Sequence, residues 1–246
     1  MSPTFAELPL RSQTIEALHA HGFLAPFAIQ EMVLPIALAD GDVIGQAKTG
    51  TGKTLAFGVP MLQRVSKAEP KRPTGLILVP TRELAVQVKD ALAPLGKAFG
   101  VSVKAMYGGV SMDPQVDALR KGVEIIVGTP GRLIDLMERN EMELSGVEVM
   151  VLDEADRMAD MGFMPQVQKI FYRATGPHQT MLFSATLDGA VDRTGQRHRD
   201  HDAGSVAFVR TLCPGAKQQS AGQKWRRPRS GDQSQPLRND GRNAAP

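Results

Sequence analysis

Short apolar runs alternate with longer amphipathic stretches through most of the chain. Runs rich in Val, Ile and Leu occupy residues 42–46, 75–79, 101–107, 123–128, 147–152 and 179–183. Apolar residues recur every three or four positions at 10–20, 28–39, 53–66, 82–99, 112–121, 131–139 and 162–174. The runs predict strands buried on both faces, and the recurring spacing predicts helices. We therefore expect an α/β fold, with a mostly parallel sheet and helices on both of its faces.

The pattern ends near residue 193. Residues 194–246 are rich in Gly, Arg, Gln, Ser and Pro, with one weak apolar patch at 206–209. They hold ten Lys/Arg and four Asp/Glu, against 19 and 22 in residues 1–193, so the net charge of +3 comes from this tail. The tail has too little apolar surface to offset the entropy of ordering, so it is predicted to be disordered. We interpret it either as a genuine basic tail or as the product of a frameshift near codon 193.

Composition excludes several other classes of protein. Cys213 is the single cysteine, which leaves no internal disulfide and no Cys-rich zinc site. No apolar run approaches the roughly 18 residues of a membrane span. Residues 1–7 lack the basic-then-apolar order of a signal peptide. We expect a cytoplasmic protein that does not bind a membrane.

A loop rich in Gly and Thr lies between the first predicted strand and the following helix. It reads Ala47-Lys48-Thr49-Gly50-Thr51-Gly52-Lys53-Thr54. Small residues let the backbone curl so that several N–H groups point at a polyphosphate, and the helix adds its positive end. Lys53 is then placed to reach the β- and γ-phosphates, and the Thr54 hydroxyl to hold Mg²⁺. An ordinary strand-to-helix turn is the alternative, and Ala47 stands where the usual pattern has Gly; the strand–loop–helix context favours a nucleotide site.

Two adjacent carboxylates follow the strand predicted at 147–152. Asp153 is the candidate for holding Mg²⁺ through water, and Glu154 is the candidate base for the attacking water. Acidic residues are also favoured in the first turn of a helix, so capping is the alternative. A carboxylate pair and a phosphate loop in one chain together favour catalysis.

Four further stretches at predicted strand ends carry small residues, hydroxyls or arginine. They are 80–85, 108–109, 129–132 and 184–186. Backbone N–H groups, hydroxyls and guanidinium at such places bind phosphates well, and turn and capping chemistry is the alternative for each.

Taken together with Gln30, these stretches resemble the N-terminal RecA-like domain of a DEAD-box ATP-dependent RNA helicase. The resemblance covers about residues 5–193. It implies a RecA-like P-loop NTPase domain over 1–193, preceded by an adenine-reading Q-motif segment at about 3–31. It also implies that Gln30 reads adenine and that Phe5 stacks on it. The family usually has Thr-Pro where this chain has Phe27-Ala28.

The resemblance assigns roles to the remaining motif residues. It implies contacts with the RNA sugar–phosphate backbone, of low sequence specificity, from Pro80, Thr81, Arg82, Gly108, Gly109, Thr129, Pro130, Gly131 and Arg132. It implies coupling of hydrolysis to strand separation by Asp156, Ser184, Ala185 and Thr186. It implies ATP and Mg²⁺ as cofactors, with Lys53, Asp153 and Glu154 as catalytic residues.

The implied function is ATP hydrolysis coupled to RNA unwinding in a complete enzyme. The family has a second RecA-like domain, which supplies arginines to the γ-phosphate in a motif of the form His-Arg-x-Gly-Arg-x-x-Arg. This sequence contains no match to that motif. We therefore expect the chain alone to be impaired in hydrolysis and unwinding. The alternatives are a non-catalytic fragment that binds nucleotide or RNA, and a DNA-directed helicase of the same superfamily.

Overall fold

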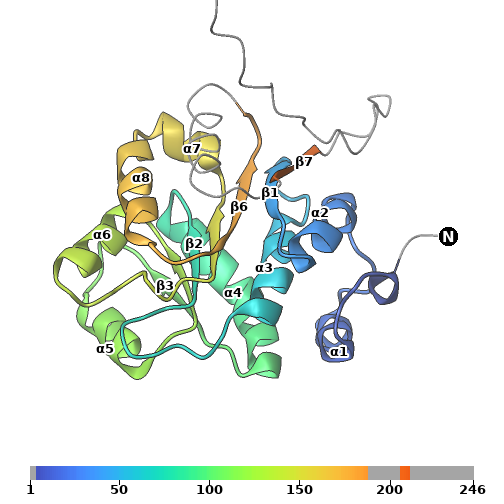
Figure 1. Cartoon of the computed structure of the whole chain (residues 1–246), viewed down its shortest axis with the longest axis horizontal. Helices are drawn as coiled ribbons and strands as arrows, with labels where there is room; N and C mark the ends of the chain where they lie inside the picture. Colours follow the sequence, from blue (N-terminus) through green and yellow to red (C-terminus); the bar gives the residue numbers. More distant parts are fainter. Residues whose placement is uncertain (1–3, 188–205, 211–246) are drawn as a thin grey trace, which may run out of the picture.

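The computed structural model describes residues 4–187 and 206–210, which form one parallel sheet with helices on both faces (Figure 1). The strands are β1 (Asp42–Gln46), β2 (Gly75–Leu78), β3 (Val103–Met106), β4 (Ile125–Gly128), β5 (Val149–Leu152), β6 (Gln179–Ser184) and β7 (Val206–Arg210). The helices are η1 (Phe5–Glu7, a 3₁₀ turn), α1 (Ser12–Ala20), α2 (Ala28–Leu38), α3 (Lys53–Arg64), α4 (Arg82–Phe99), α5 (Asp113–Lys121), α6 (Pro130–Glu138), α7 (Ala155–Asp160) and α8 (Met164–Arg173).

The sheet separates two apolar cores because successive strand residues point to opposite faces. In β5, Val149 and Val151 join the core under α2, α3 and α4, whereas Met150 and Leu152 join the core under α5 to α8. All four side chains are fully buried. Burial on both faces explains why the strands are continuous apolar runs.

Strand order decides which loops meet. The order is β3-β4-β2-β5-β6-β1-β7, and every pairing is parallel. The carboxyl ends of all strands therefore lie along one edge of the sheet. Since β1 pairs with β6 and β6 pairs with β5, the loop after β1 lies beside the segments after β6 and β5. The segments after β2, β3 and β4 form a second group along the same edge.

The predicted α/β architecture is confirmed, and each predicted strand and helix is present with ends shifted by a few residues. Pro35 lies inside α2, which continues through it. The short helix α7 was not predicted. Within the tail predicted to be disordered, residues 206–210 form β7 and pair with β1. Their apolar run suits a strand beside an otherwise unpaired edge; the rest of 194–246 lies outside the described residues.

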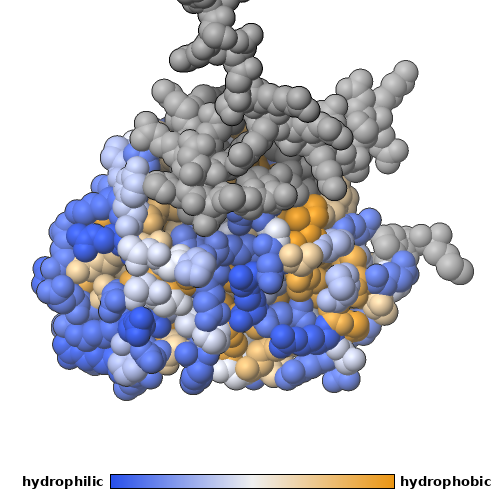
Figure 2. All heavy atoms as spheres, in the orientation of Figure 1, coloured by the Kyte–Doolittle hydropathy of each residue, from blue (hydrophilic) through white to orange (hydrophobic). Residues whose placement is uncertain are grey.

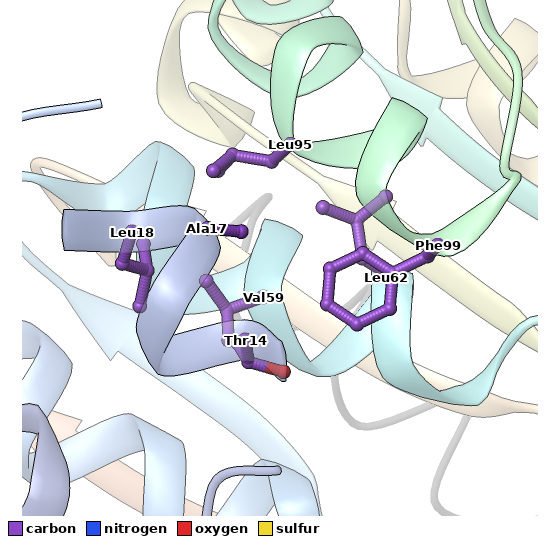
Figure 3. A pocket seen from close by; sticks show the side chains of 7 residues that line it. All are labelled: Thr14, Ala17, Leu18, Val59, Leu62, Leu95 and Phe99. Carbon is purple, nitrogen blue, oxygen red and sulfur yellow. The ribbon is translucent and has the colours of Figure 1, made fainter. Parts of the chain in front are cut away.

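Helix α1 lies across α3 and α4 through apolar contacts. Thr14, Ala17 and Leu18 face Val59, Leu62, Leu95 and Phe99 across a gap too narrow to admit water (Figure 3). This gap offers no polar group beyond the Thr14 hydroxyl, which already donates to Gln63 Oε1 at 3.0 Å. In the part of the chain that the structure describes, no helix has the length and apolar character needed to span a membrane.

Candidate nucleotide and nucleic-acid site

The loop at 47–54 has the curled backbone that its sequence predicts. Gly50 and Gly52 take left-handed conformations, with φ of 83° and 87°, which glycine adopts without the Cβ penalty. Thr51 Oγ1 donates to the Lys48 carbonyl at 2.7 Å and closes the turn. Ala47 N donates to the Ser184 carbonyl at 2.9 Å, which ties the loop to the end of β6. The loop then enters α3 at Lys53, so the predicted strand–loop–helix context is confirmed.

Lys53 and Asp153 form a buried ion pair beneath the loop. The ammonium donates to the Ala47 carbonyl at 3.0 Å and lies 3.8 Å from Asp153 Oδ1. Lys53 is 7% exposed and Asp153 is 3% exposed. Burial raises the pKa of the Asp153 carboxyl to about 6, although the positive charge of Lys53 opposes that rise. A further positive charge beside Asp153 would therefore stabilise its ionised form.

The residues present suit Mg²⁺ bound together with a phosphate. Thr54 lies in the first turn of α3, and Asp153 follows β5, so both are at the carboxyl edge of the sheet. Hydroxyl and carboxylate oxygens are the donors that Mg²⁺ prefers. Within residues 4–187, no three His, Cys, Asp or Glu side chains converge into a metal cage. A Mg²⁺ ion here would therefore keep water or phosphate oxygens as ligands, as this ion usually does.

Glu154 is held from two sides, by Thr49 of the phosphate loop and by Arg157, whose part in the site was not predicted. Its Oε1 accepts a hydrogen bond from Thr49 Oγ1 at 3.3 Å, and its Oε2 pairs with Arg157 Nη1 at 3.3 Å. Its backbone is left-handed, with φ of 52°, which costs a non-glycine residue roughly 1–2 kcal/mol. The i,i+3 spacing of Glu154 and Arg157 was the signal for this pair in the sequence.

Asp156 joins the carboxylate segment to the segment after β6. Its Oδ2 accepts from Ala185 N at 3.1 Å, Thr186 N at 3.0 Å and Thr186 Oγ1 at 3.3 Å. Its own N–H donates to Ser184 Oγ at 3.1 Å. Burial alone would raise the pKa of Asp156, but the hydrogen bonds from Thr186, Arg157 and Ser184 outweigh it and lower the pKa. The residues predicted to couple hydrolysis to strand separation are thus in direct contact.

Gln30 lies against the phosphate loop, but its amide is already bonded inside the protein. Its Nε2 donates to the Gly52 carbonyl at 2.9 Å, and its Oε1 accepts from Phe27 N at 3.0 Å. Gln30 is 1% exposed. Phe5 is 0% exposed and packs in the core under α2 to α4. The prediction that Phe5 stacks on a base therefore does not agree with the structure, since a ring with no exposed face cannot touch a ligand.

The residues predicted to hold a nucleic-acid backbone lie at the ends of β2, β3 and β4. Arg82 Nη1 lies 3.9 Å from where a Cβ on Gly109 would be, and Arg132 Nη2 donates to the Val110 carbonyl at 2.9 Å. These contacts bring the segments 80–82, 108–109 and 129–132 together.

Each of these segments also has a local structural role. Thr81 caps α4 by accepting from Leu84 N at 3.2 Å, and Thr129 N donates to the Met106 carbonyl at 3.1 Å. Pro80 is buried at the end of β2, Pro130 opens α6, and Gly108 and Gly131 have open space where a Cβ would be. Gln115 was not predicted; its Nε2 donates to the Tyr107 carbonyl at 3.1 Å and supports the loop at 107–111. Capping and binding are therefore compatible at these positions.

Comparison with known proteins identifies the family to which the chain belongs. Residues 27–194 match the family model described as DEAD/DEAH box helicase. The chain is 45% identical over 191 residues to the DEAD-box ATP-dependent RNA helicase CshA of Streptococcus pneumoniae, covering 78% of this chain and 36% of that protein. It is 47% identical over 195 residues to the ATP-dependent RNA helicase DeaD of Escherichia coli, covering 79% and 31%. The chain thus spans about a third of the length of these curated relatives.

Solved structures share the fold. A DEAD box protein from the hyperthermophile Methanococcus jannaschii superposes with a TM-score of 0.74 at 34% identity, over 84% of this chain and 55% of that one. The RNA-helicase Prp28 from Chaetomium thermophilum, solved bound to ADP, gives a TM-score of 0.73 at 38% identity, over 79% and 48%. The RecA-like architecture that the motifs implied is therefore confirmed.

Proposed function

The chain belongs to the DEAD/DEAH box helicase family, and from this premise we propose that its site binds Mg-ATP and that hydrolysis drives RNA strand separation in the complete enzyme. The observation that carries the proposal is the buried Lys53–Asp153 pair beneath a left-handed glycine loop. A buried ion pair contributes little to stability by itself, because desolvation offsets its attraction. The Lys53–Asp153 pair lies at the N-terminus of α3, and helix N-termini bind anions, so we assign it a role in phosphate binding.

Each group in this part of the site has a task that its position suits. The backbone N–H groups of 48–54 cradle the polyphosphate, and Lys53 exchanges its bond to the Ala47 carbonyl for a phosphate oxygen. Thr54 and Asp153 hold Mg²⁺, which neutralises charge on the polyphosphate. Glu154 orients the attacking water and accepts its proton once its bonds to Thr49 and Arg157 are exchanged.

RNA lies along the second group of loops in this proposal. Arg82 and Arg132 are cations that can pair with phosphates, and Thr81, Gly109 and Thr129 offer hydroxyl and backbone groups. These groups touch the backbone and not base edges, so low sequence specificity is expected. Asp156 joins the carboxylate segment to the segment 184–186, because it bonds Ala185 and Thr186 while lying two residues from Glu154.

The test is an RNA-stimulated ATPase assay on the 246-residue chain and on a full-length relative, each with the Glu154→Gln change or its equivalent. We expect hydrolysis in the full-length protein to be stimulated by RNA and abolished by the change. The chain alone should show negligible stimulation, because arginine groups of the kind that the family's second domain supplies contribute about 10³–10⁵ in rate. Strong stimulation of the chain alone would overturn the expected impairment, and hydrolysis that survives Glu154→Gln would overturn the assignment of the base.

A non-catalytic role is the second candidate function, and the hydrogen bonds of Glu154 to Thr49 and Arg157 favour it. Both of its carboxylate oxygens are bonded within the protein. A chain that binds Mg-ATP and RNA without turnover, even when a second RecA-like domain is added, would support this candidate. Preferential stimulation by DNA in the same assay would instead indicate a DNA-directed helicase.

A further inference from the structure

Phe27 is a large exposed aromatic residue that lies directly on the phosphate loop. It is 58% exposed, and it stands at the N-cap of α2. A Cβ built on Gly52 would lie 2.7 Å from Phe27 Cδ2 and 3.3 Å from Cγ, so one edge of the ring packs on the backbone of Gly52. Gly52 directly precedes Lys53, so the ring borders the loop that is proposed to hold the phosphates.

An exposed apolar side chain is not unusual by itself, and its surroundings decide its meaning. Hydrophobic residues gather near α2, whereas the side of α5 and α6 is hydrophilic (Figure 2). Leu24, which is 68% exposed, precedes Phe27 by three residues. Thr, which this family's pattern usually has at position 27, would cap the helix, and no side-chain cap is formed by Phe27. The ring therefore replaces a capping group without a gain in local helix stability.

Gln30 lies beside Phe27, and its amide is bonded within the protein. One of its two N–H groups donates to the Gly52 carbonyl, its oxygen accepts from Phe27 N, and 1% of its surface is exposed. Hydrogen-bond readout of a base edge needs exposed donors and acceptors, whereas stacking needs only an exposed ring. Phe5, the other aromatic residue considered for this role, has no exposed face.

We propose that Phe27 is the surface on which the nucleotide base stacks. The inference rests on the proposed function, since it requires the phosphates to be held at 47–54. Stacking acts on the face common to all bases, so the Phe27 contribution should be nearly the same for adenine and guanine. The ring should contribute nothing to a ligand that has phosphates but no base.

The test is calorimetric titration of the 246-residue chain with Mg-ATP, Mg-GTP and Mg-tripolyphosphate. Phe27→Leu keeps an apolar group on Gly52 and removes the aromatic face, and Phe27→Tyr keeps the ring. We expect Phe27→Leu to weaken both nucleotides by about 5- to 150-fold, the range for loss of base–aromatic stacking. Phe27→Tyr should stay within about threefold of the unaltered chain, because its ring presents the same face. Neither change should alter tripolyphosphate affinity.

Each of four results would overturn the inference. Nucleotide affinity unchanged in Phe27→Leu would show that the ring does not touch the base. An equal loss for tripolyphosphate would show that the ring only supports the loop, and thermal unfolding of each variant would reveal such a loss of structure. Equal affinity of the unaltered chain for tripolyphosphate and ATP would refute base stacking and leave the proposed function standing. Failure of all three ligands to bind would overturn the proposed function, and the inference with it.

Discussion

Replacing Gly52 with Ala should destabilise the protein more than the same change two residues earlier. Gly50 and Gly52 have nearly equal left-handed φ values, 83° and 87°, so both changes carry the same backbone strain of about 1–2 kcal/mol. Both also reduce the freedom of the unfolded chain equally. The surroundings differ: a Cβ at Gly50 meets nothing within 4 Å, whereas one at Gly52 lies 2.6 Å from Gln30 Nε2 and 2.7 Å from Phe27 Cδ2.

Gly52→Ala should lose more stability because hydrogen bonds of Gln30 must break to make room for the Cβ. Moving Gln30 away breaks its bonds with the Gly52 carbonyl and with Phe27 N, which are 2.9 and 3.0 Å long. Two such buried hydrogen bonds contribute about 1 kcal/mol each to stability. The free energy of unfolding of Gly52→Ala should therefore be about 2 kcal/mol below that of Gly50→Ala.

Denaturant unfolding of the two variants and of the unaltered chain measures this difference directly. Under linear extrapolation, equal slopes would show that the change lies in folded-state stability. In a thermal scan the same difference corresponds to about 4–8 °C between the two midpoints. Equal stability of Gly52→Ala and Gly50→Ala would refute the contact among Gly52, Gln30 and Phe27.

Three other changes test the electrostatics. Burial would raise the pKa of Glu124, but hydrogen bonds from Lys67 and Ser102 outweigh it and lower the pKa from 4.5 to about 2. The free energy of unfolding of Glu124→Gln should therefore be about 2–3 kcal/mol lower than that of the unaltered chain at pH 7. This difference should shrink as pH falls from 4.5 towards 2, and a difference that does not change with pH would contradict the prediction. Burial raises the pKa of Asp153 from 3.8 to about 6, so the free energy of unfolding should fall as pH rises between those values. In calorimetry, the Mg-ATP affinity of the unaltered chain should fall below pH 6, and Asp153→Asn should remove that fall. Asp156→Asn should speed hydrogen exchange at the Thr186 amide, and unchanged protection would argue against their bond.

The fold was largely predictable because its signals are local. Buried strands such as β5 need continuous apolar runs, and the parallel order forces long helical crossovers between them. The motifs follow strands, so their convergence at one edge was predictable without coordinates. The five-residue strand β7 was missed because its short apolar patch lies in a polar segment, where composition favoured disorder.

The detail of the site was less predictable because it depends on long-range packing. The sequence places Phe5 and Gln30 by their motif, but their burial is decided by how η1 and α2 pack on the core. Phe27 stood out only as a departure from a pattern, and its contact with Gly52 requires coordinates. The hydrogen bonds of Glu154 depend on its left-handed backbone, and a positive φ at a non-glycine residue has no signal in the sequence.

Lys53 and the loop around it are expected to hold the phosphates of Mg-ATP. Calorimetric titration of the 246-residue chain with Mg-ATP tests this role, with Lys53→Ala compared against Lys97→Ala. Lys97 is an exposed lysine in the last turn of α4, at the end of that helix farthest from the carboxyl edge of the sheet. We expect saturable binding that Lys97→Ala retains and Lys53→Ala loses. Equal binding by both variants, or no binding by the unaltered chain, would contradict the account.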